Sequence, residues 1–182
     1  EKLGVGYEQL RDVRPDLIYT SVSGFGVTGP YRNRVTMGGA MDGFAGYSWL
    51  RHYPDSTPDT ASYSTHTDTV TAVTAATAAV MALYRRTVNG KGLFLEIAGV
   101  EASITHLGEL IIDFAMNGSV ASSVGNSQRS EAPHGAYRCR GEDTWIAISI
   151  SSDDTWRRLV ATLGNPQGLA RTQWALNAER VA

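Results

Sequence analysis

Cysteine is nearly absent from this chain of 182 residues, since Cys139 is the only one. A single cysteine excludes an internal disulfide bond and a cysteine-based zinc cage. The sequence also lacks an excess of either charge, because 16 Lys and Arg residues stand against 18 Asp and Glu residues. Such a balance gives no broad electrostatic attraction to nucleic acid or to an anionic membrane, so neither is expected as a partner.

Long apolar runs are missing as well. None approaches the roughly 18 residues that a membrane-spanning helix requires, and the first residues show no signal-peptide pattern. We therefore expect a cytoplasmic protein. The chain does not start with Met and ends within a predicted helix, residues 173–182, which predicts a fragment of a longer protein.

The composition allows a folded core, because 42% of the residues are hydrophobic and 19% are charged. Residues 16–23 and 93–98 are rich in strand-forming side chains and predict β-strands. Residues 39–50, 68–89 and 100–117 predict helices. Strands that alternate with helices in this order favour an α/β domain with parallel strand pairing.

The character of the sequence changes after Gly118. Residues 119–134 hold five serines, one glycine and one proline, which predicts a linker. Beyond the linker, a predicted hairpin and a helix at residues 152–163 indicate a smaller α+β unit. The predicted organisation is thus a larger α/β part at residues 1–118, a linker, and a smaller part at residues 135–182.

Three glycines follow the first predicted strand, at the spacing Gly24-x-Gly26-x-x-Gly29. This pattern is typical of a dinucleotide-binding loop when a helix begins at the third glycine. Here Pro30 follows at once and no apolar helix begins, so the pattern does not predict a nicotinamide or flavin cofactor. We expect a sharp turn that brings backbone close to another group, because glycine permits both.

A His-x-Asp pair, His66 and Asp68, lies at the start of the longest predicted helix. A catalytic metal site normally needs a third protein ligand, and none has a useful spacing, so no metal is expected. Asp68 then has two interpretations. It is either the N-cap of the helix, or a carboxylate held ionised by the helix N-terminus that attacks an activated acyl group.

Six stretches, in order along the chain, carry recognisable motifs. They are residues 14–31 (RPDLIYTSVSGFGVTGPY), 64–68 (STHTD), 84–92 (YRRTVNGKG), 95–102 (LEIAGVEA), 125–137 with GN at its start and APHGAY at its end, and 154–159 (DTWRRL). Together they resemble the family III CoA-transferases, the group that includes formyl-CoA transferase, carnitine CoA-transferase and the 2-methylacyl-CoA racemases. The resemblance covers nearly the whole chain.

The resemblance implies a fold: part of a Rossmann-like large domain, followed by the start of a smaller α+β domain. In the family, both ends of a much longer chain build the large domain, and two subunits interlock like rings. This chain therefore resembles a middle segment, and an interlocked homodimer is expected for the full-length protein.

The resemblance also implies an activity, the transfer of CoA from an acyl-CoA donor to a carboxylic acid acceptor through an aspartyl-CoA thioester. The CoA thioester is the substrate, and no separate cofactor is expected. Asp68 matches the position of the family's nucleophile. Gly24, Gly26 and Gly29 would let backbone approach the ligand or a partner. Arg34 would contact a CoA phosphate, although an ordinary surface role for this arginine is equally open.

Two alternatives remain open. The racemases of the family carry a proton-transferring histidine where this chain has Met37, and methionine cannot transfer a proton, which argues against a racemase. The other alternative is a folded, non-catalytic piece in which Asp68 only caps its helix. Residues 125–134 do not show the glycine-rich loop that shields the intermediate in formyl-CoA transferase, so the resemblance does not predict the acyl group.

Overall fold

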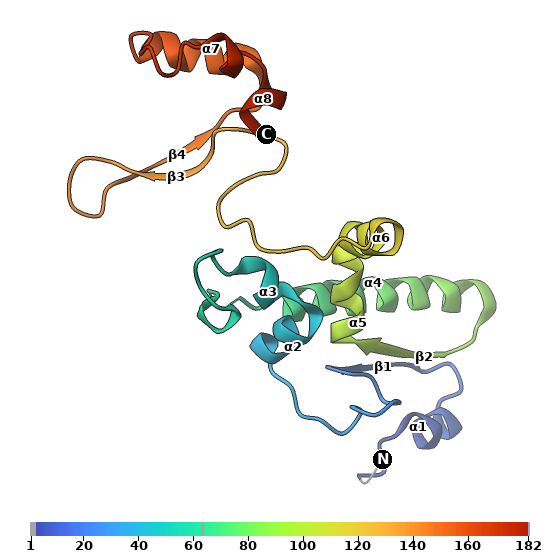
Figure 1. Cartoon of the computed structure of the whole chain (residues 1–182). Helices are drawn as coiled ribbons and strands as arrows, with labels where there is room; N and C mark the ends of the chain where they lie inside the picture. Colours follow the sequence, from blue (N-terminus) through green and yellow to red (C-terminus); the bar gives the residue numbers. More distant parts are fainter. Residues whose placement is uncertain (1–2, 63, 182) are drawn as a thin grey trace. The chain divides into compact units, whose positions relative to one another are not determined.

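The computed structural model describes residues 3–62 and 64–181. Figure 1 shows the helices and strands in order along the chain. They are α1 (Tyr7–Val13), β1 (Ile18–Ser23), α2 (Gly38–Ala45), α3 (Tyr47–Arg51), η1 (Pro58–Thr60), α4 (His66–Asn89), β2 (Leu93–Ala98), α5 (Gly99–Ile104), η2 (Thr105–Leu107), α6 (Gly108–Asn117), β3 (His134–Arg138), β4 (Trp145–Ser149), α7 (Asp153–Thr162), η3 (Thr172–Trp174) and α8 (Asn177–Val181). Helices and strands alternate, which confirms the predicted α/β class.

The chain divides into two compact units. The first comprises Glu1–His52 and Thr57–Ser122, and the second comprises Tyr53–Ser56 and Ser123–Ala182. The second unit contains the antiparallel β3–β4 hairpin. It also contains a small core of Ile150, Trp156 and Val160, to which α7 contributes Trp156 and Val160.

The first unit is built on two parallel strands, in which Ile18 lies opposite Leu93 and Ser23 opposite Ala98. The connection between β1 and β2 runs through α2, α3 and α4, which is the crossover that parallel strands require. In Figure 1, α4 lies along one side of the strands and α1 on the other. The ring of Tyr7 in α1 packs against the rings of Tyr19 and Phe94.

Several predicted helices are interrupted. The helix predicted at residues 39–50 breaks at Gly46, whose φ of +94° ends α2 in a left-handed turn before α3 begins. The helix predicted at residues 100–117 becomes α5, a 3-10 turn and α6. The terminal helix predicted at residues 173–182 is shorter and begins as a separate 3-10 turn; residue 182 lies outside the described residues.

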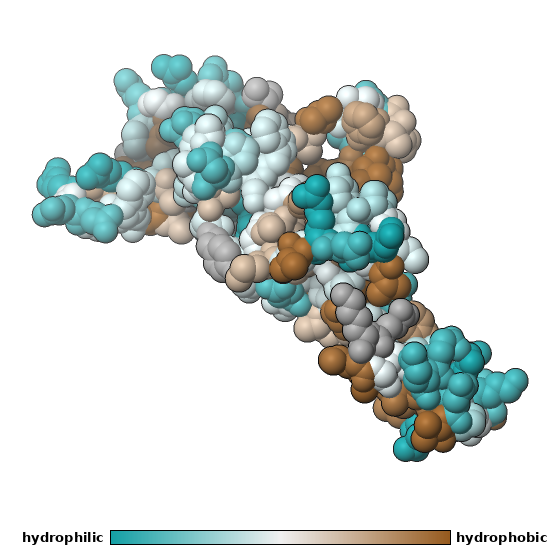
Figure 2. Space-filling view, turned by 90° about the horizontal axis from the view of Figure 1, so that it is seen from below, coloured by the Kyte–Doolittle hydropathy of each residue, from teal (hydrophilic) through white to brown (hydrophobic). Residues whose placement is uncertain are grey.

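The long helix α4 shows an apolar stripe that the first unit leaves largely uncovered. Val70 on this helix is buried, but Val80 is 65% exposed, Met81 67% and Tyr84 73%. Figure 2 views the molecule from below and shows that hydrophobic residues reach its surface there. Among the described residues, no helix is both long and apolar enough to cross a membrane.

Gly92 sets how closely the start of β2 approaches β1. A methyl group at this position would lie 2.1 Å from the carbonyl oxygen of Leu17, which already accepts a hydrogen bond from the Leu93 amide. Because that obstacle is backbone, it cannot rotate away. Gly108 offers a contrast, since a methyl group there would meet no atom within 4 Å.

We predict that Gly92→Ala lowers the free energy of unfolding by about 1–3 kcal/mol or more, as overpacking does in a tight site. Urea unfolding of the full-length protein would measure the change. Gly108→Ala is the matched control, and it should leave stability unchanged or slightly higher, because alanine favours helices. Equal effects of the two substitutions would contradict the close approach at Gly92.

Candidate active site

Asp68 lies in the first turn of α4. The helix begins at His66, with Thr65 as the N-cap residue, so Asp68 is the third helical residue. The prediction that Asp68 is the N-cap is therefore wrong, because the helix starts two residues earlier than its periodicity predicted. The Asp68 side chain is exposed, and the free N–H groups and dipole of a helix N-terminus stabilise a negative charge in this turn.

A second aspartate, Asp42 on α2, caps α4 from outside the helix. Its Oδ1 accepts hydrogen bonds from the Thr67 amide at 3.0 Å and from the Thr67 hydroxyl at 2.6 Å. Its Oδ2 forms an ion pair with Arg51 at 2.9 Å. Asp42 is 1% exposed and Thr67 is 0% exposed. The Thr65 side chain makes no cap hydrogen bond, so Asp42 supplies the acceptor that the helix end needs.

Tyr47 connects this buried aspartate to the core. Burial raises the pKa of the Tyr47 phenol above its usual value, and the charge of Asp42 raises it further, while Arg51 lowers it. The phenol therefore keeps its proton at neutral pH and donates a hydrogen bond to the Ser103 carbonyl at 2.8 Å. The Tyr47 ring also packs against Met41, Ala45 and Val100 in the core of the first unit.

The segment between the glycine-rich loop and α2 packs directly against the candidate nucleophile. A methyl group on Gly38 would lie 2.2 Å from Oδ2 of Asp68, so a side chain at this position would displace the carboxylate. A methyl group on Gly24 would lie 2.0 Å from the Thr36 hydroxyl oxygen. Residues 36–38 thus lie against the loop at one end and against Asp68 at the other.

Asp68 lies at the wall of a hollow of about 340 Å³. Ser23 and Gly24 line it from the carboxyl end of β1, and Thr36 and Thr71 add two hydroxyl groups. The Ser23 hydroxyl is buried and has no hydrogen-bond partner in the described part of the chain. A buried polar group of this kind is available to a bound ligand.

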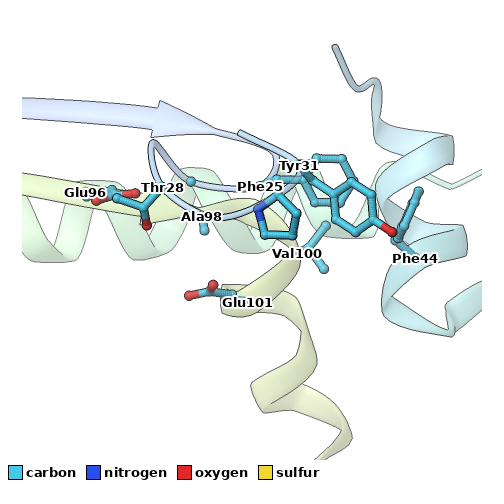
Figure 3. Close-up of a pocket in the computed structure, with 11 residues that line it drawn as sticks. Phe25, Thr28, Tyr31, Phe44, Glu96, Ala98, Val100 and Glu101 are labelled. Carbon is cyan, nitrogen blue, oxygen red and sulfur yellow. The ribbon is translucent and has the colours of Figure 1, made fainter. Parts of the chain in front are cut away.

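A larger hollow of about 550 Å³ is lined by other residues of the glycine-rich loop together with residues of β2 and α5 (Figure 3). Phe25, Tyr31 and Phe44 form one end, where their ring centroids lie 4.8–5.7 Å apart. Glu96 lies at the opposite end in Figure 3, and Glu101 projects into view from α5. Both hollows are at the carboxyl ends of the parallel strands, the edge at which α/β sheets bind ligands.

Gly24, Gly26, Gly29 and Arg34, which the resemblance assigned to CoA or partner contacts, do not line one common hollow. Gly24 lines the smaller hollow with Asp68, whereas Gly26 and Gly29 line the larger one. The Gly26 and Gly29 φ angles, +83° and +80°, are those that favour glycine. Arg34 lines neither hollow; its guanidinium lies over the Tyr31 ring, 5.2 Å from the centroid.

The described residues contain no group of three or more His, Cys, Asp or Glu side chains that could hold a metal ion. The ring of His66, which the sequence paired with Asp68, packs against the rings of Tyr47 and His106.

Three polar residues of this region were not predicted as functional from the sequence. Asp42 lies outside the recognised stretches, and Ser23 and Glu96 lie within the stretches 14–31 and 95–102, where the motifs assign neither of them a role. Asp42 acts on a helix that begins 24 residues later, and no local signal predicts such a contact. Glu96 occupies an exposed position of β2, which is typical of an ordinary solvent-facing strand residue.

These features define an α/β protein with a candidate active site at the carboxyl ends of its parallel strands. The sequence model of "CoA-transferase family III" matches residues 1–182. The chain therefore belongs to CoA-transferase family III.

Two similar relatives come from Chloroflexus aurantiacus. The chain is 29% identical over 180 residues to a succinyl-CoA–D-citramalate CoA-transferase, covering 99% of this chain and 44% of that protein. It is 30% identical over 168 residues to the beta subunit of a succinyl-CoA–L-malate CoA-transferase, covering 92% of this chain and 41% of that protein. The chain thus spans less than half the length of these relatives.

A solved structure shares the fold. A CAIB/BAIF family protein from Brucella suis matches with a TM-score of 0.86 and 28% identity. The match covers 99% of this chain and 47% of the Brucella protein.

The cap that Asp42 provides leads to a testable difference between two substitutions. Asp42→Ala removes both the acceptor for Thr67 and the partner of Arg51. We expect a loss of about 3 kcal/mol in unfolding free energy, at the low end for a broken buried ion pair because Arg51 is 29% exposed and can reach water. Asp42→Asn keeps an acceptor oxygen for Thr67 and should lose less.

Urea unfolding of both variants in the full-length protein measures these losses. If Asp42→Ala were as stable as the parent protein, the cap would contribute nothing and α4 would be held by its other contacts.

Proposed function

We propose that the full-length protein transfers CoA from an acyl-CoA to a carboxylic acid through an aspartyl-CoA thioester on Asp68. The observation that carries this proposal is the exposed Asp68 carboxylate beside a hollow, on a helix end that a buried aspartate holds in place. A carboxylate is a suitable nucleophile here because its anhydrides react in both directions.

The first half-reaction consumes the donor. An Asp68 oxygen attacks the acyl-CoA carbonyl, which forms a mixed anhydride and expels CoA as its thiolate. The thiolate attacks the Asp68 carbonyl, and the anhydride breaks to give an aspartyl-CoA thioester and the free donor acid. The oxygen that bridged the anhydride leaves with the donor acid.

The second half-reaction is the reverse sequence with the acceptor. The acceptor carboxylate attacks the aspartyl thioester, which forms a new anhydride and expels the thiolate again. The thiolate attacks the acceptor carbonyl, so the acceptor leaves as its CoA thioester and Asp68 is regenerated. One oxygen of Asp68 now comes from the acceptor acid.

The walls of the smaller hollow suit this chemistry. The N-terminal turn of α4 places the Asp68 side chain at the wall of this hollow. The Ser23 hydroxyl lies in the same hollow without a hydrogen-bond partner among the described residues, and it can donate a hydrogen bond to the oxygen that gains charge in a tetrahedral intermediate. The Thr71 hydroxyl already donates to the Thr67 carbonyl at 2.6 Å. Gly38 has no side chain, and this leaves Oδ2 of Asp68 unobstructed on that side.

Dicarboxylic acids are the substrate class that we propose. Both Chloroflexus relatives are named as enzymes of succinyl-CoA, and their acceptors, D-citramalate and L-malate, carry two carboxyl groups. Succinyl-CoA and L-malate are therefore the first donor and acceptor for the test below. The racemase alternative has less support, because Met37 caps α2 at the position of the racemase histidine and cannot transfer a proton.

We predict that acceptor acid labelled with ¹⁸O in its carboxyl groups will transfer label to Asp68 during turnover with succinyl-CoA. Mass spectrometry of the peptide that holds Asp68 measures the label. Asp68→Asn should take up no label and lose turnover while the free energy of unfolding changes little, because an amide at this third helical position leaves the Asp42 cap intact.

Thr69, the next residue, is exposed, and its hydroxyl donates a hydrogen bond to the carbonyl of the N-cap residue Thr65, so Thr69→Ala is a control that should keep the labelling. If the Asp68 peptide stayed unlabelled while the acceptor was converted to its CoA thioester, the covalent mechanism would be wrong. Exchange of the donor's α-proton with deuterium from solvent would instead support the racemase alternative.

We also propose that the full-length protein forms a homodimer. The support is the uncovered apolar stripe of α4, since exposed apolar surface of this kind marks protein contacts. Light scattering after size-exclusion chromatography should give twice the chain mass for the full-length protein. A monomeric mass at micromolar concentration would contradict the dimer and leave the stripe to be covered within one chain. The cytoplasmic location remains a prediction.

A further inference from the structure

Glu96 makes a contact that the transfer chemistry does not use. It lies on β2, yet its Oε1 accepts a hydrogen bond at 2.5 Å from the Val27 amide, in the loop that follows β1. The two residues are 69 positions apart in the chain. Since Glu96 pairs with Ser21 in the parallel register, its side chain reaches toward the carboxyl end of the neighbouring strand.

The Glu96 carboxylate occupies the space beneath the loop. A methyl group on Gly26 would lie 2.9 Å from Oε1, and the Gly26 φ of +83° already requires glycine. The loop is anchored a second time at its first residue, where the Gly24 carbonyl accepts from the Val100 amide at 3.0 Å. Both anchors come from the segment of β2 and α5, so this segment determines the course of the loop.

The loop has few apolar contacts of its own at this point. The Val27 side chain is 44% exposed, so burial contributes little to holding it. A hydrogen bond to a carboxylate is stronger than one to a neutral acceptor. Among the described residues, the Glu96 carboxylate is the acceptor that holds the Val27 amide in the middle of the loop.

The position of this loop decides the shape of both hollows. Gly24 lines the hollow that holds Asp68, whereas Phe25, Gly26 and Gly29 line the larger one. A loop that moved away from Glu96 would change the wall between them. We propose that Glu96 is a positioning residue: it holds the glycine-rich loop in the conformation that guides the acyl-CoA thioester to Asp68. The guiding role rests on the proposed function, but the hold on the loop does not.

Glu101 provides a matched comparison. It lines the same larger hollow and carries the same charge, but it makes no hydrogen bond to the loop among the described residues. Glu96→Ala and Glu101→Ala therefore remove the same charge from the same hollow, and only the first removes the restraint. Glu96→Gln keeps an acceptor oxygen for Val27.

Hydrogen exchange on the full-length protein without any ligand tests the hold on the loop. We expect exchange in a peptide covering residues 24–29 to become about tenfold faster in Glu96→Ala, the equivalent of losing one charge-assisted hydrogen bond. Glu96→Gln should restore most of the protection, and Glu101→Ala should leave it unchanged. Amides of β1 report general unfolding and should exchange as in the parent protein.

Steady-state kinetics with succinyl-CoA test the guiding role. We expect Glu96→Ala to raise the KM for the acyl-CoA more than it lowers kcat, and Glu96→Gln to recover most of the loss. Unchanged exchange in Glu96→Ala would overturn the proposal. A raised KM with unchanged exchange would also overturn it, because Glu96 would then contact the ligand itself.

If Glu96→Ala exchanged faster at residues 24–29 but kept the KM for the acyl-CoA, the guiding role of Glu96 would be wrong. These outcomes are separate from the proposed function. If the Asp68 peptide takes up no label while the exchange result holds, the covalent mechanism fails and the assignment of Glu96 to the loop stands.

Discussion

The buried carboxylate of Asp42 joins the parts of the first unit on which the candidate site depends. It binds the N-terminal turn of α4 through Thr67 and forms an ion pair with Arg51 of α3. Removing a carboxylate from water is costly, and only good partners on both oxygens compensate. Because Asp68 follows Thr67 directly, the bonds that satisfy Asp42 also determine where the candidate nucleophile lies.

The parallel strands add a second constraint on the same site. Ser23 and Ala98 end β1 and β2 at one edge of the sheet, so the glycine-rich loop and α5 begin side by side. Gly99 fits there because a methyl group would lie 2.8 Å from the Thr71 hydroxyl oxygen of α4. The glycine-rich loop, α4 and the start of α5 therefore lie close together. A side chain at Gly99 would push α4 and α5 apart.

The elements with strong local signals were predictable. The two parallel strands and the long helix were expected nearly where they are found, because β-branched composition and helical periodicity are local properties. The breaks at Gly46 and at residues 105–107 were not, since helical periodicity continues across them. The apolar stripe of α4 predicted the helix correctly. It did not predict that Val80 and Tyr84 on that stripe would be exposed in the first unit.

The sequence by itself determined the α/β class, through the alternation of predicted strands and helices, and the family membership, through ordered motifs along the chain. It also singled out Asp68, which has a local signal: an acidic residue among small polar residues at a helix start. Only the tertiary structure decided that Asp42 rather than Asp68 caps α4, and that Glu96 holds the glycine-rich loop. Those contacts join residues 25 and 69 positions apart. Their energy depends on burial and on distances between side chains, which no local pattern in the sequence records.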